Sequence, residues 1–212
     1  MSTVVPFSQM TEVTIDELRQ MASDCRESIW ERAKSMGREP KIYLHWTAGR
    51  YSQFWDDYHV QIDEDGKLYM PPDVTLDDDS LPATYRRNTG SVAITLLCCL
   101  GATSEDLGEM PPTEAQIESM AQAIVAIADG LWLTIDKDHV LTHGECADNE
   151  DHFLIYPHDE YGPKSTCERW DLEYLQTDES PKFNPWAEDG SRGGDVLRGK
   201  ANYYRNKWNE NE

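Results

Sequence analysis

Three stretches of the chain place apolar residues at helical spacing. Such residues recur every three or four positions over residues 14–37 and again over residues 113–130. Each stretch opens on a threonine, Thr14 or Thr113, followed three residues later by a glutamate or glutamine, which is the spacing of a capping box. A glycine at the far end of each stretch predicts where its helix ends. Residues 196–208, basic and aromatic, predict a closing helix.

Extended segments lie between these helices. Residues 41–49 are an apolar run that ends in a histidine and a small-residue turn, which predicts a buried strand presenting that histidine. Residues 58–63 and 67–70 alternate as strands do, and the Asp-Gly turn between them predicts a β-hairpin. The apolar run 91–100 predicts a central strand covered on both faces. We expect a short helix at residues 51–57.

The overall composition is that of one globular domain. The chain has 212 residues, 39% of them hydrophobic, which is enough to bury a sizeable core. Its formal net charge of -21 argues against nucleic acid or an anionic bilayer as partner, because the whole surface would repel both. An acidic protein that masks a basic partner stays open as an alternative on this charge.

The cysteines and the N-terminal residues bear on the compartment. Five cysteines, an odd number with two adjacent in an apolar run, indicate a reduced chain. Residues 1–14 lack the basic flank and apolar segment of a signal peptide, and no window approaches the roughly 18 apolar residues of a membrane span. We therefore expect synthesis in the cytoplasm without a signal peptide, and no membrane insertion.

Histidines and acids at separated positions are candidates for a metal site. Catalytic zinc is held by three protein ligands and keeps a further position for water. His45, at the end of an apolar strand, and His143, after a short apolar run, are the first two candidates. Either Cys167 or Asp171 could supply the third ligand.

The order of several short motifs is more specific than any one of them. A strand ending in His-Trp-Thr-Ala-Gly is followed by Tyr-His-Val with an Asp-Gly hairpin, then by Asn-x-x-Ser before an apolar strand. Pro-Thr-x-x-Gln then opens a helix, and Thr-His comes after it. Over about residues 40–176 the sequence thereby resembles the type 2 zinc-dependent N-acetylmuramoyl-L-alanine amidases, the family of phage lysozyme-amidases and peptidoglycan recognition proteins.

The resemblance implies an α/β fold in which a central mixed β-sheet is flanked by α-helices, with zinc (Zn2+) in a surface groove. It divides the chain into an N-terminal segment with a packing helix at residues 1–38, a single amidase domain at residues 39–178 and a C-terminal extension with a helix at residues 179–212. Residues 146–163 are strongly acidic, and we expect them to form a surface insertion in that domain.

Carried over residue by residue, the resemblance makes His45 and His143 the first two zinc ligands. The family's third ligand follows a catalytic lysine or arginine by two positions, and Arg169 stands two residues before Asp171. This favours Asp171 as the third ligand and Arg169 as the cation that stabilises the developing oxyanion. Cys167, which misses the spacing by one residue, is the alternative ligand.

Two further residues are candidates for catalysis. Tyr58 matches the family's tyrosine on the second strand, whose hydroxyl would lie near the attacking water or the tetrahedral intermediate; a tyrosine packed under the groove is the alternative. The glutamate that some members carry as a proton shuttle falls on Thr95, so that base is absent. Glu145 is a candidate substitute, and the alternative is that an acid there orients His143.

Substrate contacts are expected near the first ligand and before the central strand. Asn88 and the arginines Arg86 and Arg87 lie in the loop where the family contacts the muropeptide, and they could pair with peptide carboxylates. Solvated surface arginines are the alternative interpretation. Trp46, next to the first ligand, is a further candidate for substrate binding.

The function implied is hydrolysis of the amide between N-acetylmuramic acid and L-alanine of peptidoglycan, with peptidoglycan or a muropeptide as substrate. The alternative is a non-catalytic peptidoglycan-binding recognition module. We expect the setting to be cell-wall lysis by a phage-type endolysin or a secreted antibacterial effector, with cytosolic recycling as the other option. The protein would then act in the periplasm or at the cell wall after non-Sec export, and an effector would have an immunity protein as partner.

Overall fold

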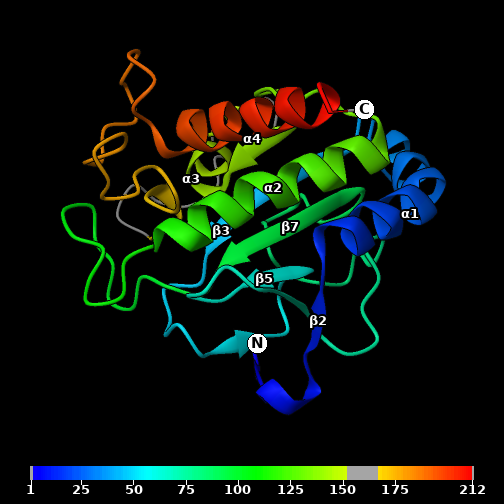
Figure 1. The fold of residues 1–212 in the computed structure, drawn as a ribbon, viewed down its shortest axis with the longest axis horizontal. Coiled ribbons are helices and arrows are strands. Elements are labelled where there is room, and N and C mark those ends of the chain that lie inside the picture. Colours follow the sequence, from blue (N-terminus) through cyan, green and yellow to red (C-terminus); the bar gives the residue numbers. More distant parts are fainter. Residues whose placement is uncertain (1, 152–166, 212) are drawn as a thin grey trace.

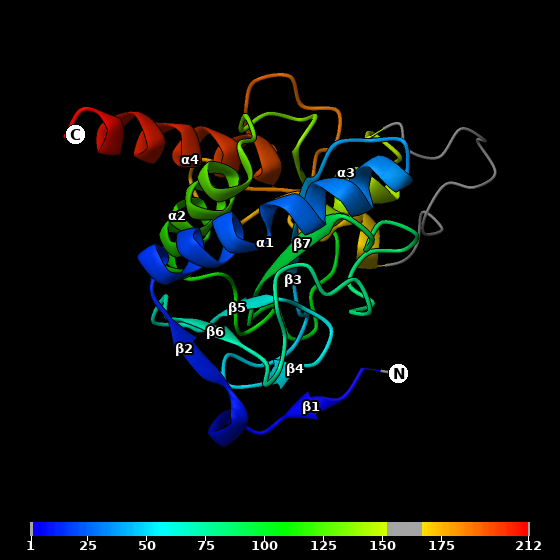
Figure 2. The ribbon, with the colours of Figure 1, turned by 90° about the vertical axis from the view of Figure 1, so that its right-hand side faces the viewer.

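A six-stranded mixed β-sheet forms the centre of the molecule, in the strand order β2-β6-β5-β7-β3-β8 (Figures 1 and 2). The computed structural model describes residues 2–151 and 167–211, and only the main chain of Cys167. The strands are β2 (Thr11–Val13), β3 (Lys41–Trp46), β5 (Val60–Ile62), β6 (Leu68–Met70), β7 (Ser91–Leu96) and β8 (Val140–Thr142). Strands β5, β7, β3 and β8 pair in parallel, whereas β6 and β2 pair antiparallel to their neighbours.

Helices flank this sheet, which confirms the predicted α/β fold class. The described helices are α1 (Ile15–Ser35), α2 (Glu114–Leu131), α3 (His143–Ala147), α4 (Gly193–Asn209) and the 3-10 turns η1 (Phe7–Gln9) and η3 (Cys167–Arg169). Helix α2 packs across β3, β5 and β7, and α1 and α4 both pack against α2 (Figure 1). Within the described residues, no helix is both long and apolar enough to cross a membrane.

The helix starts predicted from the sequence are confirmed. Thr14 and Thr113 are the N-caps of α1 and α2, and each forms a complete capping box with the residue three positions on. The predicted end of α2 near Gly130 is confirmed too, because the helix ends at Leu131, before Trp132 takes a left-handed conformation with φ 61°. A Cβ at Gly130 would lie 2.5 Å from the Cβ of Ala22, so this glycine allows α1 and α2 to approach closely.

Residues 51–57 do not form the expected helix. They contain the short strand β4 (Phe54–Trp55), which pairs antiparallel with β1 (Val4–Val5), and Figure 2 shows this small sheet at the opposite end of the molecule from α4. The side-chain amide of Gln61 binds the backbone N–H and C=O of Trp55. These partners are distant in sequence or lie in a side chain, so local spacing did not indicate them.

The predicted acidic insertion at residues 146–163 is wrong at its beginning. Cys146 and Ala147 are buried in helix α3, and Asp151 is buried against Arg87. Residues 152–163 lie outside the described residues. The predicted C-terminal extension contains α4, which packs on α2 as part of the same body.

Candidate metal centre

Three side chains converge at one edge of the sheet. His45 lies near the end of β3, His143 is the first residue of α3 directly after β8, and Asp171 lies in the turn after η3. Strands β3 and β8 are parallel neighbours, so their carboxyl ends bring the two histidines to the same edge. Each of the three residues offers one ligand atom, and these atoms all lie within 4.8 Å of one another.

The three side chains are buried and contact one another directly. The imidazole centroids of His45 and His143 are 4.7 Å apart. Nδ1 of His143 hydrogen-bonds Oδ2 of Asp171 at 2.9 Å. Nδ1 of His45 lies 3.5 Å from the same oxygen and makes no hydrogen bond within the described part of the chain. Buried polar atoms normally have a hydrogen-bond partner, so a buried ring nitrogen that has none and lies near a carboxylate is a candidate metal ligand.

Burial also fixes the charge of His45. It lowers the pKa of this imidazole from 6.5 to about 4, an effect that Asp171 only partly offsets. The ring is therefore neutral at pH 7, which is the state in which imidazole binds a metal.

The donor set fits a zinc ion. Zinc takes imidazole nitrogen and carboxylate oxygen at about 2.0 to 2.2 Å, and two histidines with one acid leave a fourth tetrahedral position open. The three candidate ligand atoms lie within 4.8 Å of one another, close enough to surround a single ion. His45, His143 and Asp171 could thus hold a metal, and their role as ligands stays a prediction.

Neighbouring groups orient two of these three side chains. Oγ1 of the buried Thr84 lies 3.0 Å from Nε2 of His45. This contact holds the imidazole ring in place, with Nδ1 on the side of Asp171. The backbone N–H of Trp46 donates to Oδ1 of Asp171 at 2.6 Å, and the carbonyl of Asp171 accepts from the N–H of Gly144 at 3.0 Å. No sequence pattern singles out Thr84, which comes just after the acidic, turn-rich residues 71–82.

Tyr58 lies beside the cluster, as expected for a residue near the reacting groups. Its half-buried ring is 5.2 Å from that of His45, centroid to centroid. Arg169 is close along the chain, but the structure places its guanidinium in an ion pair with Asp148 at the end of α3. The structure therefore brings Tyr58 to the candidate centre, whereas Arg169 must exchange a partner to act there.

Glu145 does not point into the cluster. Its two carboxylate oxygens accept from the guanidinium of Arg198 at 2.8 and 2.9 Å, and one also accepts from the backbone N–H of Thr142 as part of a capping box. These contacts make Glu145 a buried anchor of the α3 terminus. They leave it no described contact with His143, so neither role suggested for it is supported.

The residues predicted to contact substrate are those whose observed positions differ most from the prediction. The Trp46 ring is 3% exposed and packs edge-on against Tyr174, so the prediction that its indole contacts substrate is wrong. Arg87 is neither a substrate contact nor a surface arginine, because it is fully buried and forms a two-point ion pair with Asp151. Arg86 is exposed and stacks over Tyr85.

Asn88 has a supporting position behind the cluster. Its side-chain oxygen accepts from the backbone N–H of Thr84 at 2.9 Å. Because Thr84 in turn contacts His45, Asn88 helps to position the first candidate ligand. The alternative third ligand, Cys167, has its main chain in η3, and its side chain lies outside the described part of the structure.

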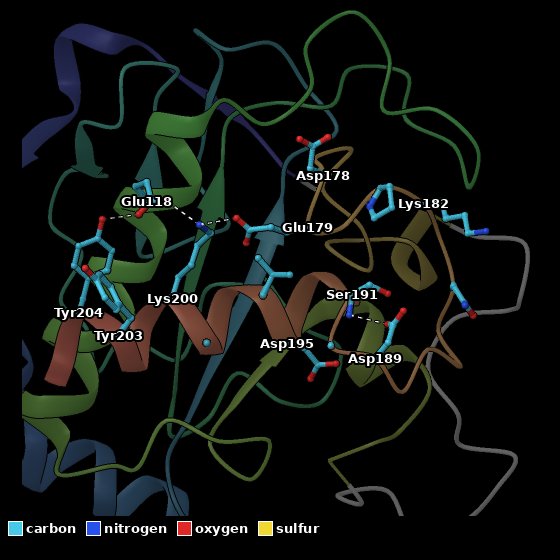
Figure 3. Close-up of a pocket in the computed structure, with 15 residues that line it drawn as sticks. Glu118, Asp178, Glu179, Lys182, Asp189, Ser191, Asp195, Lys200, Tyr203 and Tyr204 are labelled. Carbon is cyan, nitrogen blue, oxygen red and sulfur yellow. Dashed lines mark hydrogen bonds and ion pairs between the residues drawn. The ribbon is translucent and has the colours of Figure 1, made fainter. Parts of the chain in front are cut away.

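A cavity of considerable size lies away from this cluster. It has a volume of about 990 Å³ and runs along α4, with Lys200 placed between Glu118 and Glu179 (Figure 3). Neither histidine of the cluster lines it. Size alone therefore does not identify the chemical centre in this protein.

Comparisons with known proteins add one structure. No protein-family model matches the chain, and no curated protein matches it. A solved structure that does match is the endolysin LysCS, an N-acetylmuramoyl-L-alanine amidase from Clostridium intestinale, at 14% sequence identity and a TM-score of 0.36. The match covers 59% of this chain and 80% of that one. A TM-score this low carries no argument about activity.

Proposed function

We propose that this protein is a zinc-dependent hydrolase that cleaves the amide between N-acetylmuramic acid and L-alanine of peptidoglycan. The observation that supports the proposal is the buried cluster of His45, His143 and Asp171 at the carboxyl edge of the sheet. The cluster joins three residues that the sequence resemblance to the type 2 amidases selects as ligands. A binding module without catalysis has no need of this complete set.

The side chains around the cluster keep it ready to bind zinc. When bound, zinc supplies a Lewis acid and a source of nucleophilic water near neutral pH. Burial keeps His45 uncharged, and the contact with Thr84 holds its ring in place. The N–H of Trp46 fixes one oxygen of Asp171 and leaves the other directed toward His143.

Two residues are proposed to act on the substrate. Tyr58, beside His45, donates its O–H toward the scissile amide oxygen as negative charge develops there. The guanidinium of Arg169 leaves its ion pair with Asp148 and stabilises the negative charge that develops on the same oxygen. Glu145 has no part in proton transfer in this proposal, because Arg198 binds both of its oxygens.

The test combines zinc quantification with turnover of purified sacculi. We expect His45→Ala and Asp171→Ala to lose both zinc and the release of soluble muropeptides. Cys167→Ala should keep both, and so should the control His139→Gln, because His139 pairs with Glu39 and Asp136 outside the cluster.

Three results would change the proposal. Wild-type protein that binds no zinc refutes it. Zinc-loaded protein that binds sacculi and releases no product is a recognition module. Zinc lost from Cys167→Ala and kept by Asp171→Ala assigns the third ligand to Cys167.

The biological setting that we propose is lysis of the bacterial wall, by a phage-type endolysin or a secreted antibacterial effector. The enzyme would act in the periplasm or at the wall. An effector would require an immunity protein in the producing cell, and co-purification from that cell tests for one.

A further inference from the structure

The first turn of helix α4 packs directly on the two turns that carry His143 and Asp171. We call these the ligand turns, residues 142–145 and 171–173. A Cβ at Gly193 would overlap a carbonyl oxygen of turn 171–173, and a Cβ at Gly194 would overlap the carboxylate of turn 142–145. Glycine is therefore required at both positions for α4 to approach the ligand turns this closely.

Two arginines at the start of α4 bind one glutamate in each ligand turn. Arg198 donates to both oxygens of Glu145 at 2.8 and 2.9 Å, and to the carbonyl of Val140 at 2.9 Å. Arg192, the N-cap residue of α4, donates to both oxygens of Glu173 at 2.8 and 3.1 Å. A two-point guanidinium–carboxylate pair fixes direction as well as distance.

Each of these glutamates stands two residues beyond a candidate ligand. Glu145 follows His143, and Glu173 follows Asp171, while the backbone N–H of Gly144 donates to the carbonyl of Asp171 and joins the two turns. The glutamate side chains are 1% exposed and those of the arginines are 7% and 8% exposed. Buried ion pairs add little net stability compared with apolar packing, so their value here lies in the geometry that they impose.

We propose that Arg192 and Arg198 are positioning residues of the metal centre. Through Glu173 and Glu145, they hold the ligand turns in the relation that places His143 and Asp171 around one ion. Helix α4 is then a structural part of the candidate site, although none of its residues is a ligand. This inference rests on the proposed zinc site and goes beyond the amidase function, since it assigns a role to the chain after residue 179.

The helix offers a matched control. Arg205, two turns further along α4, donates to Asp129 at 3.0 Å and to the carbonyl of Leu133 at 3.0 Å. It fastens α4 to α2 and touches neither ligand turn in these contacts. Replacing Arg205 therefore loosens the helix without changing how His143 and Asp171 are held.

The test measures zinc affinity of the metal-free full chain by competition with a chelator, and the absorption spectrum of the Co2+-loaded protein. Removing a group that orients a metal ligand typically lowers affinity about 10- to 100-fold. We expect losses of this size for Arg198→Met and Arg192→Met, with a changed Co2+ ligand-field spectrum. The zinc affinity of Arg198→Lys should lie between those of wild type and Arg198→Met, because lysine keeps the charge but not the two-point geometry. The zinc affinity of Arg205→Met should stay within about twofold of wild type, since this change removes no contact to either ligand turn.

The outcomes separate this inference from the zinc proposal. Wild-type protein that binds neither ion refutes the zinc site itself. Wild type that binds zinc, with Arg192→Met and Arg198→Met binding equally well and giving the wild-type spectrum, overturns only the positioning role. An equal loss in Arg205→Met also overturns it, because general loosening would then explain the effect. If either methionine variant does not fold, Arg198→Lys and Arg192→Lys provide the same comparison.

Discussion

Thr84 provides a sharp test of how the candidate centre is organised. Its hydroxyl lies 3.0 Å from Nε2 of His45, and both residues are fully or almost fully buried. The substitution Thr84→Val keeps the shape of the side chain and removes only this hydrogen bond. The imidazole then loses the group that orients its ring, and Nε2 is left in the protein interior without that partner.

Both consequences have an expected size. Loss of a group that orients a metal ligand costs about 10- to 100-fold in zinc affinity, which corresponds to about 1.4 to 2.7 kcal/mol. Leaving a buried donor unsatisfied costs about 1 to 3 kcal/mol of the free energy of unfolding. The zinc affinity is measured by chelator competition, and the stability of the metal-free protein by urea unfolding.

Thr84→Ser is the control, because serine restores the hydroxyl while lacking the methyl group. It should recover most of the zinc affinity that the valine variant loses. A Thr84→Val protein that holds zinc within about twofold of wild type would refute the reasoning, since the expected loss is tenfold or more. Thr84 would then be a packing residue.

Three further predictions concern stability. Arg87→Met should lower the free energy of unfolding by about 3 to 5 kcal/mol, because it removes the guanidinium that neutralises the buried carboxylate of Asp151. In urea unfolding, a loss under about 1 kcal/mol would contradict this. The double variant with Arg87→Met and Asp151→Leu should recover most of the lost stability. Burial lowers the pKa of His59 below its ordinary 6.5. Below pH 6.5 the unfolded chain therefore binds a proton that the folded chain does not, so the free energy of unfolding decreases as the pH is lowered. Urea midpoints of the metal-free protein between pH 7 and 5 check this, and a His59→Gln variant with an unchanged slope would argue against it. Gly130→Ala should destabilise the protein by about 1 to 3 kcal/mol, because the new Cβ overlaps α1. Gly199→Ala in α4, where the new Cβ meets open space, should stabilise the protein by about 0.5 to 1 kcal/mol. Equal shifts of the thermal unfolding midpoint for the two variants would contradict the packing argument.

The parts of the fold that the sequence predicted are those whose causes are local. The capping boxes at Thr14 and Thr113 depend on residues three positions apart, and the hairpin of β5 and β6 depends on the Asp-Gly turn between them. The central position of β7 followed from its unbroken apolar run, since such a strand must be covered on both faces. Each of these patterns is complete within a short window of sequence.

The parts that it missed have partners far along the chain. Strand β4 exists because residues 4–5 pair with it, and Arg87 is buried because Asp151, 64 residues later, neutralises it. Thr84 gains its role only when the fold sets it against His45. His45, His143 and Asp171 were selected through the family resemblance, and their sequence spacing alone did not place them together.

The contacts between α4 and the ligand turns also determine when the centre can form. The groups that build and hold it range from His45 to Arg198, so a chain still emerging from the ribosome lacks part of the site until α4 has been made. Contacts of such long range form late in folding, and an ion that binds only the native arrangement stabilises the finished fold alone. Metal uptake would then report that α4 has been made and has packed on the ligand turns. Protection from proteolysis by added zinc, absent in chains that stop before α4, would reveal that coupling.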